Sequence, residues 1–162
     1  MYCLELKIPP AMLVLLFAVV MWFVSSMNPW AVIQIPGKEW VAGALWLIGF
    51  ALIIVAAVEF ISAKTTANPL TPGLATSIVT TGVYRLSRNP MYVGFLLMLA
   101  AWGVFLANVL SVLLLPLFVV YLNRFQIISE ENALLAKFGD DYARFNFLRT
   151  IKLYGVDRRF IG

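Results

Sequence analysis

Four long apolar segments constrain the fold of this chain more than any other feature of its sequence. They cover about residues 9–27, 40–61, 90–106 and 109–126. A helix needs about 20 residues to cross the hydrocarbon core of a bilayer, so the last two segments are short spans. The composition agrees, because 62% hydrophobic and 12% charged residues lie outside the range of soluble globular domains. We therefore expect an all-α integral membrane protein with four transmembrane helices, in which residues 1–162 form a single domain.

The connections between these segments predict how the helices are joined. Ala107 and Asn108 are the two residues between the third and fourth segments, so those segments should form an antiparallel helical hairpin. The loop 62–89 is rich in Thr, Pro, Ala and Gly, which is typical of an extended segment. We expect this loop to lie over one face of the membrane.

The carboxyl-terminal tail, residues 129–162, has a helical pattern of its own. Ser129 followed by two glutamates is typical of a helix start, because a hydroxyl caps the first turn and acidic residues favour the positive end of the helix dipole. Gly139 should end this helix, and Asp140 or Asp141 should begin another. We therefore expect a helical tail outside the membrane.

Basic residues are distributed unevenly between the two faces that four spans define. With four spans, both termini, the loop and the tail share one face. The basic residues of that face are Lys7, Lys64, Arg85, Arg88, Arg124, Lys137, Arg144, Arg149, Lys152, Arg158 and Arg159. The opposite face carries only Lys38. Since positive residues mark the cytoplasmic side, we expect both termini, the loop and the tail to be cytoplasmic.

The net charge of +4 is also interpreted as a sign of a position at the membrane. Basic residues beside a membrane attract anionic lipids, so the lipid bilayer is the expected partner of these side chains. The chain has no basic repeat and no soluble recognition element, so we expect no nucleic acid partner.

Two reactive residue types are scarce, and their scarcity excludes several kinds of chemistry. The chain has no histidine and a single cysteine, Cys3. Without histidine, no mechanism that depends on an imidazole is available, and one cysteine supports neither a disulfide nor a thiolate metal site. We therefore expect no metal.

Polar residues are concentrated in two stretches that flank the predicted hairpin. The first is GVYRLSRNPMYVG, residues 82–94, and the second is NRFQIISEENALLAKFGDDYARF, residues 123–145. Together they resemble the isoprenylcysteine carboxyl methyltransferase family of integral membrane methyltransferases, in its bacterial type. The matching positions are Gly82, Tyr84, Arg85, Arg88, Pro90, Tyr92, Gly94, Glu130, Glu131, Leu134, Phe138, Gly139 and Tyr142.

The resemblance implies an enzyme that transfers a methyl group from S-adenosylmethionine to a lipophilic acceptor at the cytoplasmic face of a bacterial inner membrane. This acceptor, a small molecule or a lipid-modified partner, is expected to bear a carboxylate. The implied cofactor-binding residues are Val83, Tyr84, Asn89, Pro90, Tyr92, Glu130 and Leu134. Arg88 and Glu131 are the candidate catalytic residues, and the guanidinium fork of Arg88 suits a carboxylate. Such chemistry suits a chain without histidine, because an activated methyl group and an anionic acceptor need alignment more than a base.

Asn89 occupies the position at which the family has a histidine. An asparagine amide can reproduce the hydrogen bond of a neutral imidazole, but it cannot titrate near neutral pH. We therefore interpret Asn89 as a binding group rather than a proton carrier. The tail also departs from the family pattern, with Phe145 in place of a second tyrosine.

The motif residues also have interpretations that involve no ligand. Arg85 and Arg88 have the placement of interfacial anchors, and Tyr84 and Tyr92 have that of an aromatic belt. Pro90 suits the first position of a helix in either case, because its missing N–H costs nothing there. Both interpretations stay open at this point.

The acidic residues are equally open to two interpretations. Glu130 and Glu131 suit the first turn of a helix through the dipole alone. Glu59, near the end of the second segment, suits an ion-paired or snorkelling residue at the cytoplasmic interface. An acid within a span is costly, so a functional role for Glu59 is the other interpretation.

Two further functions are compatible with the sequence. One is an NADPH-dependent membrane reductase of the sterol-reductase type, which has a similar Arg-x-Pro-x-Tyr pattern. The other is a noncatalytic membrane protein that keeps the architecture. The acidic, Phe-Gly and Tyr positions of the second polar stretch favour the methyltransferase. The sequence specifies neither the acceptor nor the oligomeric state.

Overall fold

The computed structural model describes residues 9–62, 82–85, 87 and 89–139, and every regular element in these ranges is helical. The longer helices are α1 (Pro10–Met27), α2 (Lys38–Ser62), α3 (Pro90–Leu106), α5 (Leu114–Leu122) and α6 (Ile128–Phe138). The short elements are η1 (Pro29–Ala31), η3 (Gly82–Arg85), α4 (Val109–Val112) and the π-helical turn η4 (Asn123–Ile127). The all-α fold class is confirmed for the described residues. The second tail helix, expected from Asp140 or Asp141, lies outside them.

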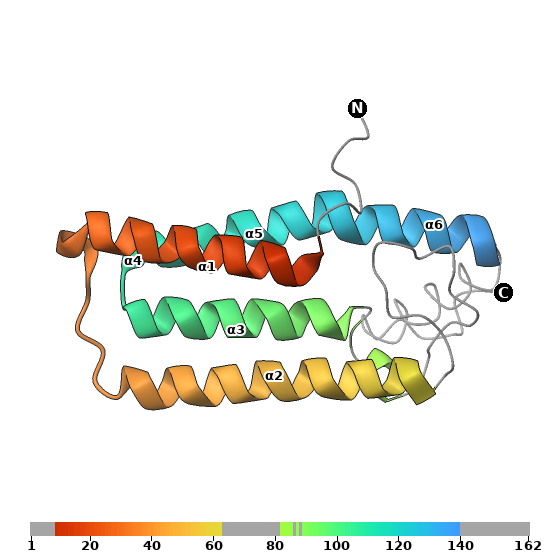
Figure 1. Cartoon of the computed structure of the whole chain (residues 1–162), viewed down its shortest axis with the longest axis horizontal. Coiled ribbons are helices and arrows are strands. Elements are labelled where there is room, and N and C mark those ends of the chain that lie inside the picture. Colours follow the sequence, from red (N-terminus) through yellow and green to blue (C-terminus); the bar gives the residue numbers. More distant parts are fainter. Residues whose placement is uncertain (1–8, 63–81, 86, 88, 140–162) are drawn as a thin grey trace, which may run out of the picture.

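The helices α4, α5 and α6 follow one another along a single rod (Figure 1). The prediction that a new helix starts at Ser129 is wrong, because α5 passes into α6 through η4 with helical backbone angles at both junctions. Ser129 is the second residue of α6 and lies inside the continuous rod, so the glutamates after it are not at an exposed helix start. Gly139 ends α6, as predicted, and its φ is 50°.

The predicted hairpin turn is confirmed at Ala107 and Asn108. Ala107 closes α3 in the left-handed region, with a φ of 49°. The side-chain oxygen of Asn108 accepts the N–H of Ser111 at 3.2 Å, and its amide nitrogen donates to the carbonyl of Asn28 at 2.9 Å. The N–H of Ile33 donates to the carbonyl of Ala107 at 2.8 Å. The connection between α1 and α2 is therefore tied to the turn between α3 and α4.

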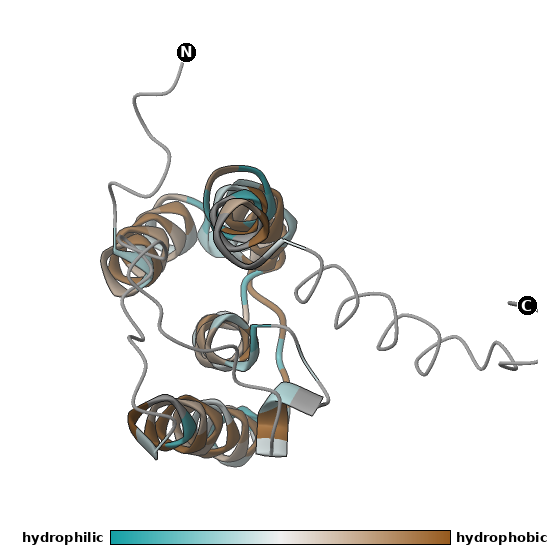
Figure 2. Ribbon diagram, turned by 90° about the vertical axis from the view of Figure 1, so that its right-hand side faces the viewer, coloured by the Kyte–Doolittle hydropathy of each residue, from teal (hydrophilic) through white to brown (hydrophobic). Residues whose placement is uncertain are grey.

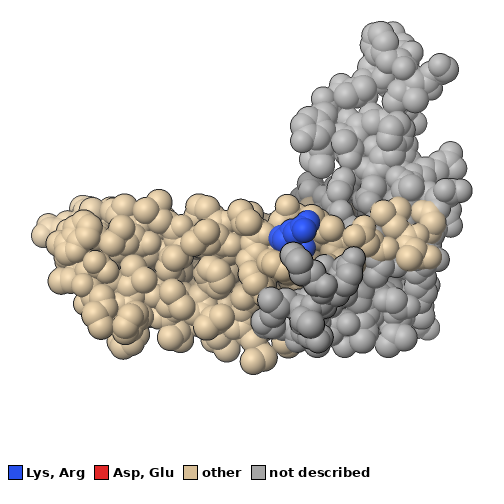
Figure 3. Space-filling model, turned by 90° about the horizontal axis from the view of Figure 1, so that it is seen from above, with Lys and Arg blue, Asp and Glu red and all other residues tan. Residues whose placement is uncertain are grey.

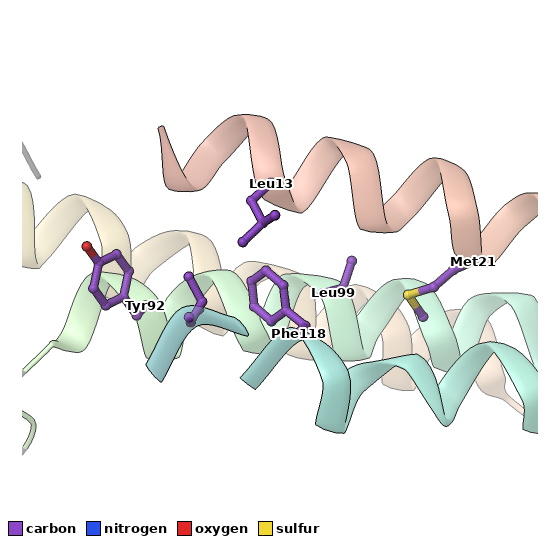
Figure 4. Packing of buried hydrophobic residues seen from close by; sticks show 6 residues of the cluster. Leu13, Met21, Tyr92, Leu99 and Phe118 are labelled. Carbon is purple, nitrogen blue, oxygen red and sulfur yellow. The ribbon is translucent and has the colours of Figure 1, made fainter. Parts of the chain in front are cut away.

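Helix α3 lies at the centre of the bundle, with α2 on one side and α1 and the α4–α6 rod on the other (Figure 2). The main core cluster is shared by α1, α3 and α5. Its buried members, five of which Figure 4 labels, are Leu13, Met21, Tyr92, Leu99, Phe118 and Leu122. Two polar contacts reinforce this packing, since Trp102 donates to the carbonyl of Ala18 at 3.0 Å and the Ser111 hydroxyl donates to that of Met21 at 2.7 Å.

Helices α2 and α3 approach closely at two glycines. A Cβ built on Gly94 would lie 2.7 Å from the carbonyl oxygen of Gly49 and 2.5 Å from Cγ1 of Ile53. A Cβ on Gly49 would in turn lie 2.7 Å from the carbonyl oxygen of Gly94. Small residues permit this kind of close backbone contact between membrane helices. Because Gly94 lies near the start of α3, the contact holds that end of α3 against α2.

The outer surface of the bundle is apolar. Large hydrophobic side chains such as Leu15, Leu47 and Val120 are exposed, and the described surface in Figure 3 shows basic atoms at one place, toward the end that carries α6. Three helical stretches are long and apolar enough to cross a membrane, and they cover Pro10–Met27, Lys38–Glu59 and Val109–Glu130. Helix α3 is also apolar but has 17 residues. Exposed apolar surface on this scale is expected of a membrane-embedded protein.

The contact between α2 and α3 predicts that Gly94→Ala destabilises the fold. The added methyl group must displace the backbone of Gly49 or the side chain of Ile53, and overpacking of this kind costs about 1–3 kcal/mol. Gly43→Ala is the matched control, because nothing lies within 4 Å of its added Cβ and alanine favours a helix. Thermal unfolding in detergent should show a lower midpoint for Gly94→Ala alone. Equal midpoints for the two variants would contradict the close approach.

Candidate functional site

The polar residues singled out in the sequence gather at one end of the bundle. There the last turns of α2, the short helix η3 and the start of α3 lie together, and α6 forms the end of the rod on the same side of the bundle (Figure 1). A small core cluster holds these elements in place. Ala56 of α2 and Tyr84 of η3 are buried in it, and Val83 and Met91 pack against them. Two of the predicted cofactor-binding residues, Val83 and Tyr84, are therefore fixed to the end of α2.

A hydrogen bond connects the two polar stretches of the sequence. The hydroxyl of Tyr92, near the start of α3, donates to Oε2 of Glu130, in α6, at 3.2 Å. Tyr92 is buried at the end of the main core cluster (Figure 4), and Glu130 is half-buried. The hairpin thus brings together residues that are 38 positions apart, one from each of the two polar stretches that flank it.

Tyr84 lies within the electrostatic reach of two carboxylates. Burial raises the pKa of its phenol above the usual range, and the negative charges of Glu130 and Glu59 raise it further. Both effects favour the neutral form, since a phenolate would be poorly solvated and would repel the carboxylates. Tyr84 therefore keeps its proton at neutral pH and can donate a hydrogen bond.

Glu59, in the last turn of α2, belongs to the same site. Its Oε1 accepts the backbone N–H of Val83 at 3.0 Å. Its Oε2 is buried and has no hydrogen-bond partner among the described residues. The sequence left Glu59 open between an interfacial charge and a functional acid, and nothing in it pointed to Val83 as the partner. The carboxylate is thus directed at η3.

Asn89 and Pro90 begin α3. Pro90 is the first helical residue, as predicted, and it is buried. Asn89 is at the N-cap position, half-buried, and its carbonyl accepts the N–H groups of Tyr92 and Val93 at 3.0 and 3.2 Å. The side chain of Asn89 makes no capping hydrogen bond. It is therefore not engaged in holding the helix end.

The π-helical turn η4 precedes Glu130 and contains a polar residue that sequence reasoning missed. Gln126 is fully buried there, and it lies four positions before Glu130. Residues four apart share a helix face, so Gln126 is on the side of the rod that carries Glu130. Single π-helical turns occur often at functional sites. The signal in the sequence is the position of this glutamine in a largely apolar segment, four residues before Glu130.

Three of the predicted site residues are described in part or not at all. Arg88 lies outside the described residues, so its catalytic assignment stays a prediction. The backbone of Glu131 and Leu134 belongs to α6, one and four positions after Glu130, but their side chains are not described. Leu134 is therefore on the same helix face as Glu130.

The described site offers hydrogen-bond donors and acceptors. No group of three or more His, Cys, Asp or Glu residues that could hold a metal ion occurs in the described part of the chain. Two tyrosine hydroxyls and two carboxylates lie near one another beside the apolar core clusters. Such an arrangement can bind a small polar ligand that carries hydroxyl or ammonium groups.

Comparisons with known proteins identify the family of the chain. A family model described as phospholipid methyltransferase matches residues 38–141, which include all of the first polar stretch and most of the second. A protein of Haemophilus influenzae, described as uncharacterized, is 46% identical over 55 residues, which are 34% of this chain and 87% of that relative. No solved structure gave a significant match. The family match confirms the resemblance found in the two polar stretches, and the chain belongs to the phospholipid methyltransferase family of membrane methyltransferases.

Proposed function

We propose that the chain is an S-adenosylmethionine-dependent methyltransferase whose cofactor binds where η3, the start of α3 and α6 meet. The hydrogen bond between Tyr92 and Glu130 carries this proposal, because it joins the two polar stretches into one site. Family membership favours methyl transfer over the NADPH-dependent reductase. The residues assigned to the cofactor are Val83, Tyr84, Asn89, Pro90, Tyr92, Glu130 and Leu134.

The described residues fit this cofactor by their chemistry. The carboxylate of Glu130 can accept hydrogen bonds from ribose hydroxyls or from an ammonium group, and the amide of Asn89 can both donate and accept. The protonated hydroxyl of Tyr84 adds a donor. S-Adenosylmethionine supplies a methyl group on positively charged sulfur, so the protein contributes alignment and exclusion of water rather than a base.

The acceptor is proposed to be lipophilic and to carry an anionic group, with a carboxylate as the first choice. The apolar exterior allows such a molecule to approach from the bilayer, and the family description accords with a lipid. Arg88 is assigned to the anion, because a guanidinium presents two parallel donors and stays charged beside a cationic sulfur. Glu131 is the second catalytic candidate.

The proposed topology has four spans, with both termini and the site on the cytoplasmic face of a bacterial inner membrane. The 17 residues of α3 extend over about 26 Å at 1.5 Å per residue, close to a hydrocarbon core of about 30 Å. Helix α3 lies between the longer helices and antiparallel to the rod (Figure 1). Basic residues on the side of the site support the orientation.

Cysteine labelling tests this topology in a Cys3→Ser background. Gln34→Cys lies in the exposed connection between α1 and α2, and Ser62→Cys lies at the exposed end of α2. An impermeant maleimide added to intact cells should label Gln34→Cys, whereas Ser62→Cys should react only after the membrane is made permeable. Labelling of both positions from the same side would contradict the span count.

Methyl transfer from labelled S-adenosylmethionine to extracted lipids tests the proposed function. Wild-type protein in membranes should produce labelled lipophilic product. Arg88→Lys should lower the rate at least about tenfold, about 1.4 kcal/mol of transition-state stabilisation, because lysine keeps the charge but loses the fork. Arg85→Lys is the matched control and should cost much less. Equal and small effects at both positions would remove Arg88 from the catalytic site, and no labelled product with any lipid fraction would contradict methyl transfer.

A further inference from the structure

We propose that Glu59 is a positioning residue that holds η3 in the conformation required for cofactor binding. The inference rests on the proposed function, and it adds a residue of α2 to a site otherwise built from η3, α3 and α6. Glu59 lies outside the two polar stretches that resemble the family. Its role follows from three features of the contact between α2 and η3.

The first feature is the hydrogen bond between Glu59 and η3. Oε1 of Glu59 accepts the N–H of Val83, and the two residues are 24 positions apart in the sequence. Val83 is at the start of a four-residue helix, where a backbone N–H has no partner within the helix. A carboxylate satisfies such a group well, since charge-assisted hydrogen bonds are among the stronger ones. Glu59 thus caps η3 from a different helix.

The second feature is the absence of a side chain at position 82. Gly82 has a φ of 52°, and a Cβ built on it would overlap the carboxylate of Glu59. The carboxylate therefore occupies the space that any other residue at position 82 would need. Glycine is required here both by the backbone conformation and by the contact with Glu59. This gives a physical reason for the glycine that opens the first polar stretch.

The third feature is that the placement of Glu59 does not favour the stability of α2. A negative charge in the last turn of a helix lies at the negative end of the helix dipole. In addition, Oε2 is buried without a hydrogen-bond partner among the described residues. Buried polar atoms without partners are uncommon in proteins, and each one calls for a specific explanation. The contact of Oε1 with η3 gives a reason for a carboxylate at this position.

The contact has a direct consequence for Tyr84. The hydrogen bond to Val83 also fixes Tyr84, the next residue of η3. The buried ring of Tyr84 packs on Ala56, and its hydroxyl lies in the electrostatic field of Glu130 and Glu59. Without Glu59, the backbone of η3 would lose its attachment to α2 beside this ring. The proposed cofactor contacts of Val83 and Tyr84 would then have to be ordered during binding, which lowers affinity.

Two substitutions at Glu59 separate positioning from general stability. Glu59→Ala removes the acceptor, whereas Glu59→Gln keeps an acceptor oxygen at the same reach. We expect Glu59→Ala to bind S-adenosylhomocysteine at least about tenfold more weakly, and Glu59→Gln to stay within about threefold of wild type. Hydrogen exchange of the Val83 amide should be faster in the alanine variant only. Glu39→Ala, which removes an exposed carboxylate from the first turn of the same helix, should change neither quantity.

A double-mutant cycle tests the contact between Glu59 and Gly82 directly. Gly82→Ala should weaken S-adenosylhomocysteine binding in the wild-type background and should weaken it less in the Glu59→Ala background, because the overlap is then gone and only the strain of the positive φ remains. Unchanged affinity and unchanged exchange in Glu59→Ala would overturn the proposal. If the wild type does not bind S-adenosylhomocysteine, the proposed function fails, and exchange at Val83 still decides whether Glu59 holds η3.

Discussion

The hydrogen bonds of Asn108 determine which parts of the chain can meet. Its side chain caps the rod at Ser111 and binds the carbonyl of Asn28, so the turns at this end of the bundle are locked to one another. A buried amide is costly unless it is satisfied, and the side-chain oxygen and nitrogen of Asn108 each have a partner here. Because α3 and the rod both run back from this turn, Tyr92 and Glu130 come together at the opposite end.

The opposite end differs in character from the rest of the bundle. Most of the molecule presents apolar side chains to its surroundings, whereas Glu59, Tyr84, Tyr92 and Glu130 form a compact polar group. Polar groups at one end of an apolar bundle suit an encounter between a water-borne cofactor and an amphiphilic acceptor whose apolar part stays in the bilayer. The proposed function places the reaction at this boundary, and Glu59 gives the site an attachment to α2.

Local sequence signals predicted much of the fold. Apolar segment length predicted the helices, Pro90 predicted the start of α3, and Gly139 predicted the end of α6. The two residues at the hairpin turn were also predicted, because so short a connection leaves no alternative to antiparallel packing. These features depend on interactions between residues close in sequence, which composition and spacing reflect.

Features that depend on distant contacts were not predictable. Ser129 has the sequence of a helix start, yet it lies inside the continuous rod, because η4 passes into α6 with helical backbone angles just before it. The contact of Glu59 with Val83 and the approach of Gly49 to Gly94 join separate elements. Neither leaves a periodic pattern, and glycine or glutamate alone indicates no partner.

The most direct test of whether the two polar stretches form one cofactor site is the binding of S-adenosylhomocysteine in detergent. Thermal unfolding measures this binding for wild type, Tyr92→Phe, Glu130→Gln and the double variant. At a hundred times the dissociation constant the ligand should stabilise the wild type by about 2.7 kcal/mol, while NADPH should have no effect. Glu130→Gln should weaken binding, and the double variant should lose less than the sum of the single losses, because the two side chains share a hydrogen bond. Stabilisation by NADPH instead, or wild-type affinity in Glu130→Gln, would contradict this account of the site.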